Sequence, residues 1–157
     1  MDVVIKKATL DDLKTVQKLN LKLFEKEHKE YDSLLNMDRT FSIEGIKYYQ
    51  NRISKEDGCV LIAIVNNKIV GYLCGGMSKW EAYRHLPLVA ELENTFVLEE
   101  FRSQWIGCKL YNTFVKWCTK KNVGKIRVQA SAQNEWAIRF YRNNNFKDYT
   151  LILETDL

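Results

Sequence analysis

The segment "RSQWIG", residues 102–107, has the residue types of a turn that leads into a helix and binds a phosphate group. At the start of a helix several backbone N–H groups lack an intrahelical acceptor, and the helix dipole adds partial positive charge. A pyrophosphate can accept hydrogen bonds from these groups whatever the side chains are. Glycine would allow the closest approach, so Trp105 fits this function only if its side chain points away from the ligand. We expect Trp105 in an ordinary helical conformation at the rim, although the segment alone is equally typical of a helix start that binds nothing.

Glu91 and Glu93 occupy alternate positions of residues 88–98, a segment with the residue types of a strand. Alternate residues of a strand share one face, and an interior strand of an α/β sheet seldom carries two carboxylates there. Either the strand lines a wet cleft or each carboxylate has a cationic partner such as Arg84 or Lys79, because unpaired buried carboxylates are costly. Neighbouring carboxylates also raise one another's pKa, which suits a general base that works near neutral pH.

Hydrophobic periodicity and turn residues predict the elements that hold these side chains. Apolar residues at helical spacing after Thr9 predict a first helix, and Asn66 and Asn67 suit the positive φ of a tight hairpin turn between two apolar runs. The expected order is a strand at 3–8, a helix after Thr9, a helix at 42–53, a hairpin at 58–76, a strand at 88–98, a helix after Trp105, a strand at 125–131, a helix at 134–144, and one long or two short strands at 146–157.

This order predicts the fold class. Strand–helix–strand units pair in parallel whereas a hairpin is antiparallel, so we expect an α/β fold with a mixed central β-sheet flanked by helices. The chain has 157 residues, of which 46% are hydrophobic and 28% charged. This size and balance are typical of one compact domain, here residues 1–157.

Composition also argues against several classes of protein. The longest apolar run, residues 59–65, is too short to cross a bilayer, so a soluble cytoplasmic protein without a membrane partner is expected. The net charge of +4 is mild and spread along the chain, which does not indicate nucleic-acid binding. The four cysteines lack the spacing of a zinc site, so no metal is expected.

Two blocks of the sequence resemble the signature blocks of the GNAT superfamily of N-acetyltransferases. In the first, "VLEEFRSQWIG" at 97–107, Val97, Arg102 and Gly107 fit the family pattern, and Trp105 stands where the family has glycine. In the second, "NEWAIRFYRNNNF" at 134–146, Asn145 replaces a glycine, a mild change because asparagine also suits a left-handed helix end. The residues of this block that fit are Asn134, Ala137, Phe140, Tyr141 and Phe146.

The resemblance implies a GNAT-like fold with acetyl-CoA as cosubstrate, and it implies roles for particular residues. Phe96 and Val97 would offer backbone groups to the pantetheine arm, Asn134 would steady that arm, and Tyr141 would protonate the leaving thiolate. The pyrophosphate would be held by the residues of the turn, namely Arg102, Ser103, Gln104, Trp105, Ile106, Gly107 and Cys108. The Trp105 indole could lie over the adenine or ribose of coenzyme A, or merely cover apolar surface.

Spermidine/spermine-type acetyltransferases are similar in carrying a glutamate four residues before the matching valine, which here is Glu93. Glu93 is therefore the first candidate for the general base, through a water, and Glu91 is its neighbour or the binder of a cationic substrate. Two salt-bridged surface carboxylates are the alternative. Several aromatic residues could line an acceptor pocket, namely Tyr31, Tyr48, Tyr49 and Trp80.

These residues together predict an N-acetyltransferase in which a primary amine attacks the thioester of acetyl-CoA directly, and the two carboxylates favour a small cationic amine. Most of the rate would come from holding amine and thioester together. Three possibilities stay open at this point: acetylation of a protein N-terminus or lysine, a non-catalytic acyl-CoA-binding module, and assembly into a homodimer.

Overall fold

The computed structural model describes residues 2–79 and 83–157, so Trp80 lies outside the described residues. Its elements follow the order expected from the sequence as far as the last helix. The helices and strands are β1 (Val4–Lys7), α1 (Leu13–Glu30), α2 (Ile43–Ser54), β2 (Gly58–Val65), β3 (Lys68–Met77), β4 (Val89–Val97), α3 (Ile106–Lys120), β5 (Lys125–Val128) and α4 (Glu135–Asn143).

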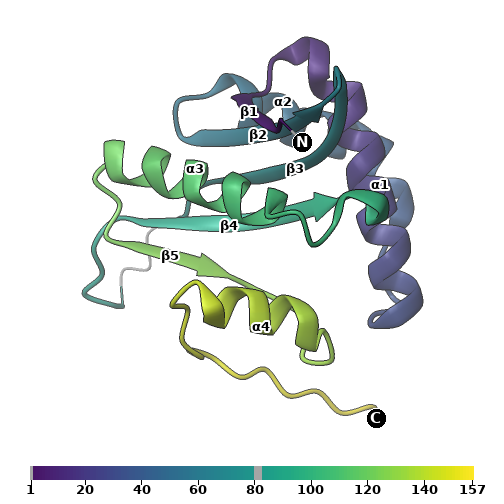
Figure 1. Cartoon of the computed structure of the whole chain (residues 1–157). Coiled ribbons are helices and arrows are strands. Elements are labelled where there is room, and N and C mark those ends of the chain that lie inside the picture. Colours follow the sequence, from purple (N-terminus) through teal and green to yellow (C-terminus); the bar gives the residue numbers. More distant parts are fainter. Residues whose placement is uncertain (1, 80–82) are drawn as a thin grey trace.

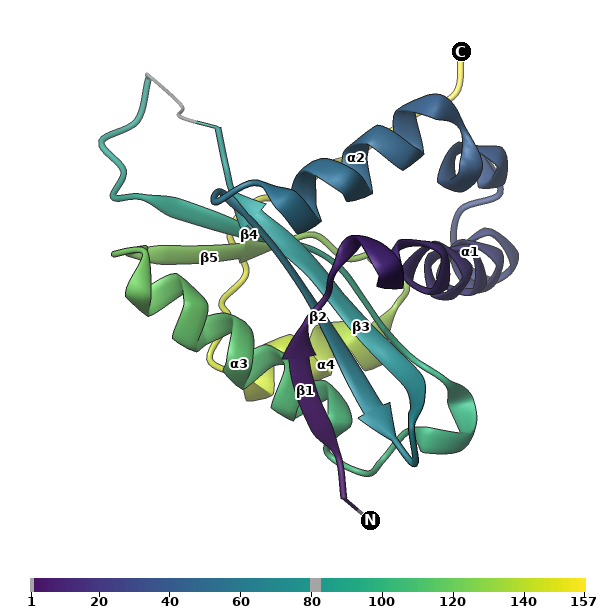
Figure 2. The ribbon, with the colours of Figure 1, turned by 90° about the horizontal axis from the view of Figure 1, so that it is seen from above.

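The five strands form one mixed sheet in the order β1-β2-β3-β4-β5, in which only β4 and β5 pair in parallel. Helices α1 and α2 cover one face and α3 and α4 the other (Figures 1 and 2). Neighbouring glycines of β3 mark the two faces. A Cβ at Gly75 would meet Phe114 of α3 at 2.8 Å, and one at Gly76 would meet Arg52 of α2 at 2.5 Å. The expectation of an α/β fold with a mixed sheet flanked by helices is confirmed.

The core lies on both faces of β2 and β3, which explains why both strands read as near-continuous apolar runs. Tyr72 and Phe114 are the largest fully buried side chains. Asn66 and Asn67 join these strands with φ of 48° and 62°, as the hairpin prediction required. In the described residues no helix is both long and apolar enough to cross a membrane.

Strand β4 is longer than its pairing with β5. The parallel pairs run from Val89–Lys125 to Leu92–Val128, whereas β4 continues to Val97. From residue 93 to 97, the edge of β4 that faces β5 has no strand beside it in the described chain. Its backbone groups are therefore open to a ligand.

The prediction of one or two strands at 146–157 is wrong, because these residues contain no strand and run as an extended tail (Figure 1). Phe146 packs against Tyr141 with 5.5 Å between ring centroids, and the ring of Tyr149 lies 5.1 Å from the Arg127 guanidinium. After these contacts the tail leaves the sheet. Strand-type residues form a strand only where an edge is within reach, and within one copy the tail does not pair with β5.

Candidate active site

The turn before α3 contains two residues in the left-handed region. Trp105, which directly precedes the helix, has φ 63° and ψ 8°, and Ser103 has φ 58°. The prediction of an ordinary helical conformation for Trp105 is therefore wrong. A side chain in this region crowds the following carbonyl oxygen, at a cost of about 1–2 kcal/mol. Glycine at position 105 would thus serve the backbone conformation of the turn as well as close approach to a ligand.

The Trp105 side chain is 76% exposed, so the indole lies toward solvent at the rim, as a phosphate site here requires. Stacking of the indole on a cofactor stays a prediction.

The left-handed residues leave a run of backbone N–H groups without acceptors. Arg102 N–H donates to Glu99 O at 3.1 Å, and Lys109 N–H donates to Trp105 O at 2.9 Å. Between them, from residue 103 to 108, no N–H of the described turn donates to a backbone carbonyl. Successive free N–H groups in such a turn, at the positive end of a helix, form a concavity that binds anions.

Arg102 fastens this turn to the end of β4. Its Nε donates to Val97 O at 3.0 Å, and its guanidinium lies 5.5 Å from the centroid of the Phe96 ring. The side chain therefore holds the turn in place, and its positive charge stays beside the free N–H groups.

The strain at Trp105 leads to a testable prediction. The free energy of unfolding of Trp105→Gly should be about 1 kcal/mol larger than that of Trp105→Ala. Alanine keeps a Cβ in the left-handed region, whereas glycine has none. Both variants lack the indole, so their comparison isolates the backbone, and urea unfolding measures it. Equal stability of the two variants would show that the turn is not strained.

Val97 directs its N–H toward the open edge of β4. Leu98 N–H donates to Val70 O at 2.9 Å, so Val97 and its partner Gly71 form a non-hydrogen-bonded pair. The N–H of Val97 then points away from β3, to the side where β5 has ended. By the same alternation Phe96 and Tyr72 form a hydrogen-bonded pair. The backbone groups of Phe96 are then used within the sheet, which does not fit the prediction that they bind the pantetheine arm.

Tyr141 is 8% exposed and lies in an aromatic cluster with Phe140 and Phe146. Phe140 is the more exposed of the two neighbouring residues, and its ring stacks on that of Trp136. Burial, and to a smaller extent the charge of Glu27, raises the pKa of Tyr141 above its usual range. In the part of the chain that the structure describes, the Tyr141 hydroxyl makes no hydrogen bond, so a protonated donor is left for a ligand.

Asn134 begins α4 and links it to α1. Its Oδ1 accepts a hydrogen bond from Ala137 N–H at 3.0 Å, and its Nδ2 donates to Glu27 Oε1 at 3.3 Å. Ser131 Oγ donates to the other oxygen of Glu27 at 3.4 Å. A contact of Asn134 with pantetheine stays a prediction. Sequence reasoning missed Glu27, because no local pattern pairs it with a residue 107 positions later.

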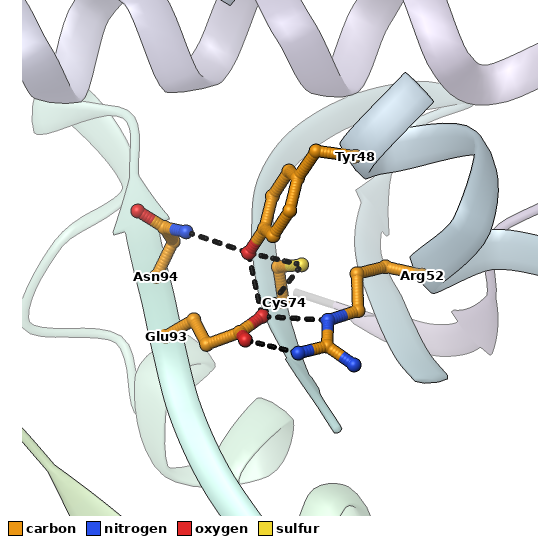
Figure 3. A network of polar contacts seen from close by, with 5 residues as sticks. All are labelled: Tyr48, Arg52, Cys74, Glu93 and Asn94. Carbon is orange, nitrogen blue, oxygen red and sulfur yellow. Dashed lines mark hydrogen bonds and ion pairs between the residues drawn. The ribbon is translucent and has the colours of Figure 1, made fainter. Parts of the chain in front are cut away.

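A bulge in β4 determines where Glu93 points. Cys74 of β3 pairs with Asn94, but Gly75 pairs with Leu92, so Glu93 is an extra residue. Because of the bulge, the side chains of the consecutive residues Glu93 and Asn94 both reach the hydroxyl of Tyr48 (Figure 3). The hydroxyl of Tyr48 donates to Glu93 Oε2 at 2.5 Å and accepts from Asn94 Nδ2 at 3.4 Å.

Arg52 completes this network from α2. Its Nε donates to Glu93 Oε2 at 2.9 Å, and its Nη2 forms the second contact, with Oε1 (Figure 3). Tyr48 and Arg52 are four residues apart on one helix, which places them on the same face. The cationic partner of Glu93 is thus Arg52, and neither Arg84 nor Lys79, which the sequence had suggested.

The network borders a cavity of about 220 Å³ between α1, α2 and β4. Tyr48 and Tyr49 contribute to its wall, as suggested from sequence, whereas Tyr31 lies at the end of α1 beside Lys26 and does not belong to the lining. The lining residues are Asn20, Phe24, Arg39, Thr40, Gly45, Tyr48, Tyr49, Glu93 and Asn94.

Glu91 lies two residues before Glu93, close enough for the two charges to interact. Burial first, and then the charge of Glu93, raises the pKa of Glu91. A carboxyl with a raised pKa in the folded state binds more protons folded than unfolded. The protonated Glu91 therefore adds to the stability of the folded protein at low pH. This added stability is lost as the pH rises through the raised pKa of Glu91.

Glu91→Gln should consequently be more stable than the wild type at pH 7.5, by less than about 1 kcal/mol because Glu91 is partly solvated. Below pH 4 the difference should vanish, since the glutamate is then protonated in both states. Thermal unfolding at the two pH values tests this, and a difference that does not change with pH would contradict it.

The mixed sheet in which β4 continues beyond β5, the helix start with free N–H groups and the nearby Tyr141 are together compatible with an acyltransferase. The sequence agrees with this class. Residues 20–146 match the family described as "Acetyltransferase (GNAT) family", and the chain belongs to this family of acetyltransferase enzymes.

Comparison with known proteins is consistent with this membership. An uncharacterized N-acetyltransferase of Methanocaldococcus jannaschii is 26% identical over 151 residues, which are 94% of this chain but only 62% of that protein. A mutant of the BH1408 protein from Bacillus halodurans has the same fold, with a TM-score of 0.85 at 20% identity over 98% of this chain and 99% of that one. AAC(6')-Iy, in complex with the bisubstrate analogue CoA-S-monomethyl-acetylneamine, aligns with a TM-score of 0.78 at 14% identity over 100% of this chain and 99% of that one.

Proposed function

We propose that this protein transfers the acetyl group of acetyl-CoA to the primary amine of a small cationic molecule. The observation that carries the proposal is the run of N–H groups from residue 103 to 108 without backbone acceptors. Coenzyme A has a pyrophosphate that can accept these hydrogen bonds. Its pantetheine arm contains amides that can pair with the open edge of β4, in the manner of an added strand. The complex of AAC(6')-Iy with a CoA-linked analogue, on the same fold, supports this choice of cosubstrate.

The first turn of α3 packs against α4, the helix that carries Tyr141. A Cβ at Gly107, in the first turn of α3, would stand 3.6 Å from the ring of Phe140, which precedes Tyr141 on α4. A ligand bound at the turn and extended along β4 therefore passes the helix that carries Tyr141. This packing supports the role of Tyr141 as the donor to the sulfur atom.

The proposed reaction is a direct transfer. The neutral amine attacks the thioester carbonyl carbon, and the oxyanion that forms accepts a hydrogen bond from Val97 N–H. The carbon–sulfur bond then breaks with its electron pair on sulfur, and Tyr141 gives a proton to the departing thiolate, whose conjugate thiol has an ordinary pKa near 8.5. Tyr141 then regains a proton from solvent, and Glu93 releases to solvent the proton that it takes from the amine. The proton of the amine leaves through a water to Glu93, the carboxylate that lines the cavity.

The acceptor amine would bind in the cavity beside Glu93. Its volume of about 220 Å³ lies below the roughly 300–1,000 Å³ of most ligand sites, so a small molecule fits better than a folded chain. Glu93 and the nearby Glu91 supply negative charge for a cationic group, and Arg52 keeps Glu93 in place.

Release of free thiol from acetyl-CoA, measured across a panel of polyamines, aminoglycosides, amino acids and peptides, tests this function. We expect small cationic amines to raise the rate most. A rise with peptides alone would indicate a protein acetyltransferase. If no acceptor raises the rate while coenzyme A still raises the melting temperature, the protein is a binding module.

A further inference from the structure

The cavity between α1, α2 and β4 has one acidic and one basic residue in its described lining, Glu93 and Arg39. The charge of Glu93 has a partner, because Arg52 donates to both of its oxygens (Figure 3). The Arg39 guanidinium makes no hydrogen bond and no ion pair within the residues that the structure describes. This holds even for Asp38 and Glu44, the acids nearest to it along the chain. Arg39 is thus the charged group of the lining that can still pair with a ligand.

The backbone that carries Arg39 is fixed between the two helices. Its carbonyl oxygen accepts hydrogen bonds from the N–H and the Oγ of Ser42, at 3.1 Å and 2.8 Å. The next carbonyl, that of Thr40, accepts from Gln17 Nε2 of α1 at 2.8 Å, and both residues are buried. A Cβ at Gly45 would clash with the Arg39 carbonyl, so glycine permits this close approach to α2. The side chain of Arg39 therefore starts from a rigid wall of the cavity.

The two charges lie at different positions along α2. Gly45, which touches the Arg39 carbonyl, is in the first turn of the helix, whereas Glu93 contacts Tyr48 and Arg52 further along it. An α-helix rises 1.5 Å per residue, so three to seven residues correspond to about 5–10 Å. A ligand that meets both charges must carry its own charged groups about that far apart.

We propose that the acceptor amine also carries a carboxylate, which Arg39 binds while the amine lies beside Glu93. A guanidinium presents donors in a planar fork that matches a carboxylate. A second ammonium group at the same place would be repelled by the charge of Arg39. The inference rests on the proposed function and deepens it, because it narrows the acceptor from any small cationic amine to one with an anionic group at its other end.

The separation of the charges predicts the length of the acceptor. An extended chain spans roughly 1.2 Å per bond, since the three backbone bonds of a residue cover about 3.3–3.6 Å. A distance of about 5–10 Å then corresponds to roughly four to eight bonds between nitrogen and the carboxyl carbon. An ω-amino acid such as ε-aminohexanoate has this length, whereas glycine is too short.

Release of thiol from acetyl-CoA with three matched amines tests the inference. The amines ε-aminohexanoate, hexylamine and hexamethylenediamine share one chain and end in a carboxylate, a methyl group and a second amine. We expect the wild-type kcat/KM for ε-aminohexanoate to exceed the other two by about tenfold, the lower range for a hydrogen bond to a charged group, because Arg39 is exposed.

Variants of Arg39 should change this preference in a defined order. In Arg39→Gln the kcat/KM values for ε-aminohexanoate and hexylamine should become nearly equal, and Arg39→Glu should favour the diamine over the amino acid. Arg139→Gln, at an exposed arginine of α4, is the matched control and should keep the wild-type preference. A thermal shift with coenzyme A shows whether each variant is folded and still binds the cosubstrate.

Two results would overturn the inference and leave the proposed function standing: a wild type that uses hexylamine or the diamine as well as the amino acid, or a preference that Arg39→Gln does not change. If no amine raises thiol release, the proposed function itself fails. Calorimetry with ε-aminohexanoate then decides about the carboxylate site. Binding to the wild type that Arg39→Gln weakens by about tenfold supports the site, and absent or unchanged binding overturns it.

Discussion

Replacing Tyr141 with phenylalanine is expected to lower kcat by about 10²–10⁴-fold, the usual contribution of a positioned general acid. The structure gives the hydroxyl no hydrogen bond within the described chain, so its removal should leave the melting temperature unchanged. The affinity for coenzyme A should also stay the same, because the pyrophosphate binds at the turn before α3. Single-turnover kinetics with acetyl-CoA and the best acceptor separate the chemical step from binding.

Tyr111→Phe is the matched control. Tyr111 belongs to the same aromatic cluster, with its ring centroid 6.5 Å from that of Phe140 and 5.8 Å from that of Phe146. Tyr111→Phe should therefore keep full activity.

The raised pKa of Tyr141, caused first by burial and then by Glu27, also means that the phenol should not ionise as the pH rises past neutrality. Full activity of Tyr141→Phe would show that the thiolate leaves without its help.

Local sequence rules predicted those parts of the fold that depend on neighbouring residues. The two asparagines at 66 and 67 adopt positive φ, and Thr9 forms a capping box with Asp12 just before α1. Trp105 is the exception, because tryptophan carries no signal for the left-handed region and only the family pattern marks the position as one for glycine. The prediction for the tail failed for another reason, since its residues favour a strand but residues 146–157 pair with no strand of the sheet.

In the candidate site too, residues in short local blocks were predicted, whereas residues that depend on distant partners were not. The turn at 102–107 and Tyr141 could be proposed from sequence because each lies within a short block. Glu27 and Arg52 were missed, because their partners lie 107 and 41 positions away. For Arg52 a weak signal exists, since Tyr48 and Arg52 share a helix face. The bulge at Glu93, which turns this residue and Asn94 to the same partner, has no marker in the sequence.

The ion pair between Glu93 and Arg52 allows a structural role of Glu93 to be separated from a chemical one. Their side chains are only 18% and 20% exposed. Removing either partner therefore leaves the charge of the other one unpaired where little water can solvate it. Each single variant, Glu93→Gln or Arg52→Met, should lose about 2–3 kcal/mol of stability, somewhat less than for a fully buried pair. In a double-mutant cycle the combined variant should lose less than the sum, because no unpaired charge is left.

Activity should not follow stability in this series. Glu93→Gln removes the carboxylate that takes up the proton of the amine, so kcat/KM should fall by about 100-fold or more even below the melting temperature of the variant. Arg52→Met keeps that carboxylate and should retain most of the rate, because Tyr48 still donates a hydrogen bond to Glu93. If both variants lose activity equally, Glu93 acts only by holding α2 against β4, and the proton of the amine must leave by another route.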